Sequence, residues 1–181
     1  MTSEKPLGSV IQGSLTQGLE VRLHPDVSVE EMRVGKFLVI QGRQSRFFCL
    51  LTDVSLDTSS QRIFANPPHP DDDFLQSVLA GSGTYGTINL APMLMLVPSR
   101  GESTERVESK LASFEANTSE DLELLPVKTI PSHFSQVFEA AERDFRSVFG
   151  WEDDPHRRNF AIGKPLDMDV PVCLDLDRLG E

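Results

Sequence analysis

The stretch GKFLVIQGRQSRFFCLLTDV, residues 35–54, points most directly to the fold of this chain. It holds two apolar runs, 37–40 and 47–54, separated by the polar turn segment Gly42-Arg43-Gln44-Ser45. Short runs rich in branched and aromatic residues, bounded by turn residues, are typical of paired β-strands. Because every residue from 37 to 40 is apolar, that strand is predicted to be buried on both faces. We predict a hairpin of central strands.

Further strands are predicted on both sides of this hairpin. In 19–23, Leu19, Val21 and Leu23 alternate with polar residues, which is the pattern of a half-buried strand. In the segment 87–97, Pro92 cannot donate a ladder hydrogen bond, so we expect it at a sheet edge or a bulge. The other predicted strands are 8–15, which Gly13 interrupts, 122–127, 160–163 and 170–176. In the last of these, one face carries Val170, Val172, Leu174 and Leu176, and the other carries Cys173, Asp175 and Asp177.

Two helices are expected among the strands. A short one follows Asp71-Asp72-Asp73 and stops at Gly81, with acidic residues at its positive end. A long amphipathic helix is predicted from Pro131-Ser132 to Gly150, because large apolar residues recur there at steps of three and four. These residues are Phe134, Val137, Phe138, Ala141, Phe145, Val148 and Phe149. The fold class is therefore mainly β with α: a small closed antiparallel β-barrel of about six strands, one long helix and one short helix.

Composition limits the functions that this chain can have. It has 181 residues, enough for one domain with a core of its own, and a net charge of −11 from 17 basic and 28 acidic side chains. Nonspecific binding to nucleic acid requires clustered Lys and Arg, whereas here the densest group is His156-Arg157-Arg158. Direct DNA binding is therefore not expected. The polar start Met1–Pro6 and the lack of a bilayer-length apolar run predict a cytoplasmic location without a membrane segment.

Two glycine motifs resemble nucleotide-binding loops without meeting their requirements. Residues 81–86 spell GxGxxG, but the predicted order is helix, glycines, strand, whereas a dinucleotide fingerprint needs a strand before and a helix after. The pairs Gly35-Lys36 and Gly163-Lys164 lack the first glycine and the hydroxyl residue of GxxxxGK[ST]. We predict a tight connection at 81–86 and turns before strands at the two GK pairs.

The remaining polar candidates also lack the sequence spacing of a metal or catalytic site. Asp71, Asp72 and Asp73 do not have the spaced ligands of a calcium loop. Cys49 and Cys173 sit apart in apolar segments, which predicts buried reduced thiols. The histidines have no metal or catalytic spacing; they are His24, His69, His133 and His156. No catalytic, cofactor-binding or metal-ligating residue is predicted.

Taken together, the strands resemble a known family, the HAS barrel, which is the N-terminal domain of HerA-type ATPases and of rotary ATP synthase subunits. The resemblance rests on residues 8–15 with 19–23, and on 34–40 with 47–54. The tail, 160–163 and 170–179, resembles the HerA segment that leads into the ATPase core.

The resemblance implies a division of the chain into four parts. Residues 1–98 are the first part of the β-barrel, and 99–121 are a polar linker, with a weak helix as an alternative at 105–114. Residues 122–150 supply a strand and the amphipathic helix packing on the barrel. Residues 151–181 are closing strands leading toward an ATPase core, and the chain is expected to end before the Walker A loop.

The function that the resemblance implies is that of a non-catalytic barrel in a HerA-like DNA translocase, serving assembly of a hexameric ring and docking of a nuclease or other protein. ATP and Mg would belong to the full-length ATPase, and no cofactor is expected in this chain. The alternative is a stand-alone barrel that binds a protein or, with less support from the charge, single-stranded nucleic acid. An enzyme is the third reading, since no constellation of residues supports it.

Overall fold

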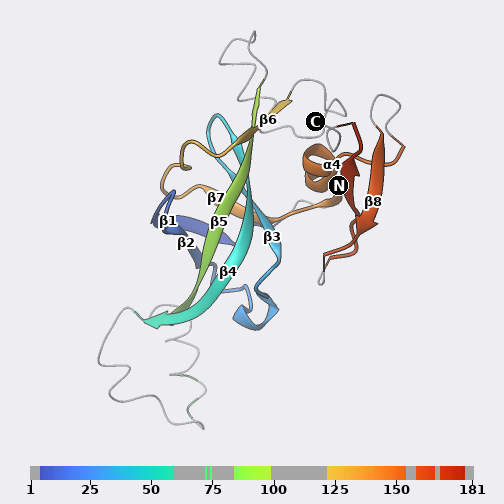
Figure 1. Cartoon of the computed structure of the whole chain (residues 1–181). Coiled ribbons are helices and arrows are strands. Elements are labelled where there is room, and N and C mark those ends of the chain that lie inside the picture. Colours follow the sequence, from blue (N-terminus) through green and yellow to red (C-terminus); the bar gives the residue numbers. More distant parts are fainter. Residues whose placement is uncertain are drawn as a thin grey trace.

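The computed structural model describes residues 5–58, 72, 74, 84–98, 122–153, 158–165 and 168–177. The first strands are β1 (Gly8–Ser14), β2 (Gly18–Leu23), β3 (Phe37–Gln41), β4 (Arg46–Thr58) and β5 (Thr84–Pro98). They are followed by β6 (Leu122–Pro126), β7 (Gln136–Glu139), β8 (Asn159–Gly163) and β9 (Val172–Asp175). A 3₁₀ turn, η1 (Val29–Glu31), precedes β3, and helix α4 (Glu142–Phe149) follows β7. Figure 1 shows α4 and β8 on one side of the larger sheet.

Six of the strands form a closed antiparallel barrel. They are paired in the order β2-β1-β7-β3-β4-β5, and a further pairing of β2 with β5 closes the ring. Strand β6 pairs with the last part of β5 and extends the sheet beyond the closed part. Closure leaves no open sheet edge in the ring, which is how small β-proteins avoid edge-to-edge aggregation. The mainly β fold and the closed barrel of about six strands are confirmed.

The predicted central hairpin forms the best-buried part of the barrel. Strands β3 and β4 pair from Phe37 opposite Leu50 to Gln41 opposite Arg46. Strand β4 continues into a long pairing with β5, whose register shifts where Cys49 lies opposite Pro92. This irregularity accommodates a residue without an amide hydrogen, and the prediction of a bulge at Pro92 is confirmed.

The interior of the barrel is filled with apolar side chains. The alternation predicted for β2 holds, since Leu19, Val21 and Leu23 are buried and Arg22 is exposed. Side chains of the other strands, together with Met32 after η1, meet them in one cluster: Val10, Met32, Leu38, Ile40, Phe47, Cys49, Leu51, Ile88, Leu90, Met95 and Val137. The barrel is therefore a packed core rather than a ligand cavity.

The long helix predicted up to Phe149 is wrong in its first half. Residues 136–139 form strand β7, which pairs with both β1 and β3, and only 142–149 are helical. Val137 points into the barrel core, and Phe138 lies opposite Val39. A short apolar run is ambiguous between helix and strand, and here the ladder bonds that close the barrel outweigh the helical spacing. Within the described residues, no helix has the length and apolar character needed to cross a membrane.

Phe134, at the turn before β7, has a strained backbone. Its φ of 64° lies in the left-handed region, and 73% of the residue is exposed. The turn is fixed to β1, because the Phe134 amide donates to the Val10 carbonyl at 2.8 Å and the Val10 amide donates to the Ser135 carbonyl at 3.0 Å. The predicted burial of Phe134 on a helix face is therefore wrong.

Several expectations lie outside the described residues. The short helix after Asp71 is described only at Asp72 and Phe74, and the linker 99–121, including the weak helix at 105–114, is not described. The same holds for His69, His156 and the first glycines of the GxGxxG segment.

Shortening a barrel-core side chain is predicted to destabilise the fold strongly. Ile40 is fully buried, so Ile40→Ala should lower the free energy of unfolding by about 2–5 kcal/mol through lost burial and a cavity. Leu56, which is 78% exposed, provides the control, and Leu56→Ala should change stability by no more than about 0.5 kcal/mol. Urea unfolding followed by circular dichroism measures both; equal effects would contradict the assigned core.

The strain at Phe134 predicts an unusual order of stability. Glycine adopts a positive φ without a steric penalty, whereas alanine retains the penalty. Phe134→Gly should therefore be more stable than Phe134→Ala by about 1 kcal/mol. Thermal unfolding of the two variants decides the matter, and an alanine variant at least as stable as the glycine variant would refute a left-handed turn here.

Candidate docking surface

Helix α4 is held on the outside of the barrel by four aromatic rings. Phe37 and Phe48 of the central hairpin lie with ring centroids 5.0 Å apart in a stacked arrangement. Phe145 of α4 meets the Phe48 ring edge-on at 5.4 Å, and Phe149 lies 5.9 Å from the same ring. Edge-to-face pairs of this kind are favourable beyond the area that they bury. The prediction that the phenylalanine-rich segment covers the barrel is confirmed for these two residues.

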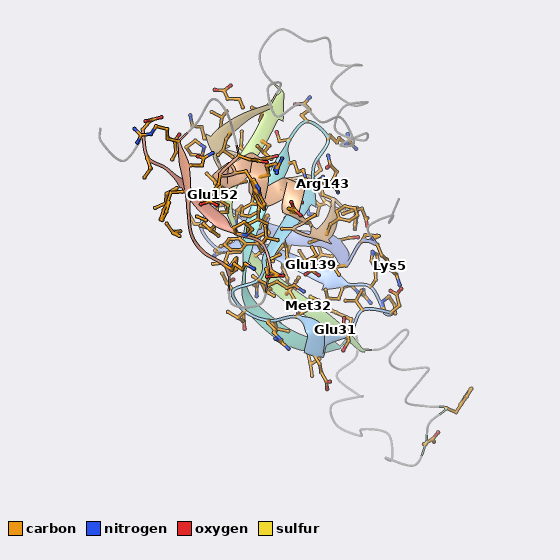
Figure 2. All side chains as sticks on the ribbon, turned by 90° about the vertical axis from the view of Figure 1, so that its right-hand side faces the viewer. Lys5, Glu31, Met32, Glu139, Arg143 and Glu152 are labelled. Atoms are coloured by element: carbon orange, nitrogen blue, oxygen red, sulfur yellow. The ribbon has the colours of Figure 1, made fainter. Side chains whose placement is uncertain are left out.

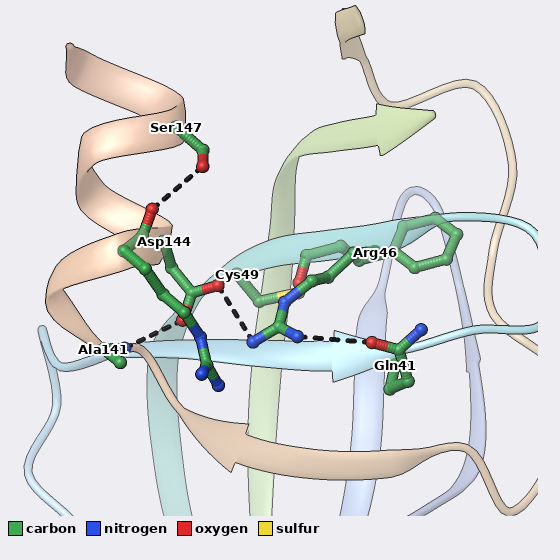
Figure 3. A network of polar contacts seen from close by, with 8 residues as sticks. Gln41, Arg46, Cys49, Ala141, Asp144 and Ser147 are labelled. Atoms are coloured by element: carbon green, nitrogen blue, oxygen red, sulfur yellow. Dashed lines mark hydrogen bonds and ion pairs between the residues drawn. The ribbon is translucent and has the colours of Figure 1, made fainter. Parts of the chain in front are cut away.

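A buried ion pair joins the same helix to the barrel. Arg46 Nη2 lies 2.9 Å from Asp144 Oδ1, with side chains only 6% and 1% exposed (Figure 3). Arg46 Nη1 donates to Gln41 Oε1 at 3.3 Å, and the Ala141 amide donates to Asp144 Oδ2 at 2.9 Å. Asp144 therefore caps the start of α4 and pairs with the arginine at the start of β4. Since a carboxylate or guanidinium is costly to bury alone, the pair fixes where the helix sits.

The small sheet of β8 and β9 packs against this helix. Cys173 is buried, and the segment before and within β9 contributes Met168, Val170 and Val172 to a second core with Phe145. The Ala161 amide of β8 donates to Glu152 Oε1 at 3.0 Å, and the carboxylate-bearing Glu152 is seen beside the red sheet in Figure 2. Both contacts fix this sheet against the rest of the molecule.

The small sheet and the residue after it also carry exposed apolar side chains. Phe160 lies directly across from Leu174, Ile162 lies where the register of the two strands shifts, and Leu176 follows the end of β9. The exposed fractions of these four residues run from 37% to 57%. We call Phe160, Ile162, Leu174 and Leu176 the exposed apolar group. Exposed apolar side chains gathered in one place are typical of an interaction surface, whereas scattered ones carry no such meaning.

Ion pairs lie beside both ends of the exposed apolar group. Arg158 lies 3.9 Å from Asp177 at the end where β8 begins, and Lys164 pairs with Asp169 just beyond the end of β8. The Lys164 ammonium lowers the pKa of the Asp169 carboxyl. Asp177 and Asp169 therefore each have a basic partner, although the chain as a whole is strongly acidic.

The tight connection predicted at 81–86 lies outside the described residues at 81–83, and 84–86 are the start of strand β5. Strand β5 begins at Thr84, so a strand and not a helix follows the GxGxxG glycines. At Gly86 a Cβ would come within 2.4 Å of the Val29 side chain, which explains the need for glycine there. Gly35, with φ 96°, lies in the turn before β3, as predicted. Gly163-Lys164 differs from the prediction, because this pair ends strand β8 instead of preceding a strand.

The described polar candidates do not come together as a reactive site. Cys49 and Cys173 are both free and buried, as predicted, and burial raises the pKa of each thiol, with the nearby Glu152 charge contributing at Cys173. Thiols kept protonated are poor nucleophiles. His24 Nε2 lies 3.5 Å from Gln136 Oε1, a contact that links the loop after β2 to β7. Among the residues that the structure describes, no three His, Cys, Asp or Glu side chains gather as a metal site.

The family model of the HAS barrel domain matches residues 7–125, more than half of the chain. The chain belongs to the HAS-barrel family. The HAS barrel is a barrel module, and the match does not indicate a catalytic family. The matched stretch contains β1 to β5 and nearly all of β6, whereas β7, α4 and the small sheet follow it. No curated protein matches this sequence.

The exposed apolar group and the ion pair of this HAS barrel were not identified from the sequence. Alternation along 170–176 showed two faces, but it did not show that Leu174 would be exposed while Val172 of the same predicted face packs against the second core. Arg46 and Asp144 lie far apart in the sequence, and no local pattern pairs them.

Breaking the buried ion pair should destabilise the protein by much more than breaking an exposed one. Arg46→Met leaves the Asp144 carboxylate buried without this partner, and the expected loss is about 3–5 kcal/mol of unfolding free energy. Arg158→Met, at the exposed pair with Asp177, should cost less than about 1 kcal/mol. The double variant Arg46→Met/Asp144→Asn should recover part of the loss. Chemical unfolding measures all three, and similar values for the two single variants would contradict a buried pair.

Proposed function

We propose that this HAS barrel is the non-catalytic N-terminal domain of a HerA-like DNA-translocating ATPase, where it serves ring assembly and the docking of a protein partner. The observation that carries the proposal is the family match over a closed barrel with a filled interior. Because the interior is packed, binding has to take place on the outside of the barrel, through its strands, loops and attached elements.

Charge supports a protein partner over nucleic acid. The chain has 28 acidic and 17 basic side chains, and a surface of this balance repels a phosphate backbone. In the proposed role, DNA, ATP and Mg are handled by the motor of the full-length protein. This chain would supply contacts to neighbouring subunits, in the manner of a hexameric ring, or to a nuclease-type partner.

A second candidate function is a stand-alone protein-interaction module. The feature that favours it is the completeness of the fold: the barrel has its own core, and a second core attaches the helix and the small sheet. Such a module would use the same exposed apolar group without any motor. The two candidate functions differ in whether an ATPase motor is joined to the barrel.

The proposed role predicts that the native protein continues past Glu181 into a GxxxxGK[ST] loop within about ten to fifteen residues. Sequencing the gene and measuring the mass of the protein purified from its source test this. The 181-residue chain should show no ATP hydrolysis above a blank, and the longer protein should lose hydrolysis when the loop lysine is replaced by alanine.

The opposite results separate the two candidates. A native protein that ends near Glu181 would overturn the ATPase role and leave the stand-alone module. Turnover of ATP by a clean preparation of the 181-residue chain would overturn the non-catalytic assignment itself.

A further inference from the structure

We propose that strand β7, with the elements that follow it, is exchanged between copies of this chain, so that β7 of one copy fills the place between β1 and β3 of another. The inference deepens the assembly role proposed above and, as an assembly mechanism, rests on that role. The exchanged segment lies beyond residues 7–125, the stretch that the family model matches, although β7 completes the ring of the barrel.

The place that an exchanged strand would fill is defined by β7 itself. Its residues pair along β3 on one side and with Gly8 and Ser9 of β1 on the other. Val137 points into the barrel core, and Lys36 Nζ lies 2.9 Å from Glu139 Oε1. A second copy carries the identical strand, so it can make the same hydrogen bonds in the same register.

Exchange keeps the contacts that attach helix α4. The helix would reach the barrel of the neighbouring copy with the same Arg46–Asp144 pair and the same edge-on contact of Phe145 with Phe48. Replacing a buried contact by an identical one leaves the buried area unchanged. The two forms therefore differ in the linking segment between β6 and β7, residues 127–135, and in the entropy of association.

The turn at the end of this linking segment is strained while β7 stays in its own barrel. The Ser135 amide donates to the Ser132 carbonyl at 3.2 Å, and Phe134, with a φ of 64°, is the third residue of this four-residue turn. A positive φ at that position favours glycine or asparagine, because a larger side chain crowds its own backbone. A chain that crosses to its neighbour in an extended conformation is free of this strain. Strained hinge loops favour strand exchange for this reason.

Strand β1 offers a longer ladder than β7 uses. It pairs with β2 from Gly8 to Ser14, whereas its ladder with β7 ends at Ser9 and gives way to two bonds between Val10 and the turn. Gln12, farther along β1, is exposed. A linking segment that runs straight would continue alongside β1 and add hydrogen bonds that the turn prevents.

Strand exchange is compatible with a ring. When each copy gives β7 to the next, the arrangement is head-to-tail, which closes into a ring where the rotation between copies allows it. Two free chains have no ring to complete, and reciprocal exchange between them gives a closed dimer. Because β7 has to leave its own barrel before it can exchange, this dimer should form on refolding and separate slowly, unlike a complex of two exposed surfaces.

Refolding the 181-residue chain from urea at near-millimolar concentration tests the inference. The wild-type chain should give a dimer in sedimentation velocity, and the separated dimer should persist after dilution. Phe134→Gly removes the strain of the turn and should lower the dimerisation constant at least about ten-fold. Phe134→Ala is the matched control, because it removes the same ring but keeps the strain. This control should dimerise like the wild type.

Cysteines introduced across the β1–β7 ladder identify the exchanged strand. Gln136 Nε2 donates to Ser9 Oγ at 3.1 Å, so thiols at these two positions would face each other. The variants Ser9→Cys and Gln136→Cys, refolded together and then oxidised, should give a dimer whose disulfide joins the two introduced thiols, as mass spectrometry of a digest shows. Leu56→Cys refolded with Gln136→Cys is the control and should give no such link, because Leu56 pairs with Gly86 of β5.

Three results would overturn the inference. One is a wild-type chain that refolds only as a monomer at near-millimolar concentration. Another is a Phe134→Gly chain that dimerises as much as Phe134→Ala, or no less, when circular dichroism shows both folded. The third is a dimer in which Ser9→Cys and Gln136→Cys form no link between copies, although a chain with both substitutions forms the link within its own monomer.

Failure of this inference and failure of the proposed function are distinguishable. A chain that exchanges β7 but has no GxxxxGK[ST] loop in its native form retains the exchange and loses the ATPase role. A native ATPase that assembles while the thiols introduced at Ser9 and Gln136 link only within single copies retains the role and loses the exchange.

Discussion

The β3–β4 hairpin is buried on both of its faces, and the rest of the structure depends on this constraint. Side chains that point inward, such as Ile40 and Phe47, join the barrel core, while Val39 and Phe48 on the outward side form the floor of the second core. A hairpin covered on only one side would leave an apolar surface in water, at a cost proportional to its area. Helix α4 is therefore required to cover the barrel, and the Arg46–Asp144 pair selects one position for it.

The strands could be predicted from the sequence wherever local pattern and final burial agree. This is so for β2, whose alternation matches its buried and exposed sides, and for β3, whose continuous apolar run matches its two-sided burial. It fails at 134–139, where helical spacing is present but the barrel needs a sixth strand between β1 and β3. That need arises from hydrogen bonds to strands far away in sequence, and a local window contains no record of them.

The candidate sites also divide into those that the sequence alone could decide and those that it could not. The glycine motifs could be rejected from the order of predicted elements alone, because nucleotide loops require a particular sequence of strand, loop and helix. The exposure of Leu174 could not be predicted, since Leu174 and Cys173 are both apolar enough to be buried and only the packing of the folded chain decides between them. Phe134 was predicted to be covered for its hydrophobicity, and the turn to β1 places it in solvent instead.

The second core also has a mechanical consequence. It connects the β8–β9 sheet through Phe145 to the central hairpin of the barrel, and protein interiors of this kind are close-packed. A force applied to the small sheet would therefore be passed to the barrel as a movement of one rigid body, with little of it absorbed by bending at a linker. In a protein assembly that works by moving its domains, such a connection would transmit to the barrel the displacement of a domain attached to the small sheet. The barrel would also resist that displacement.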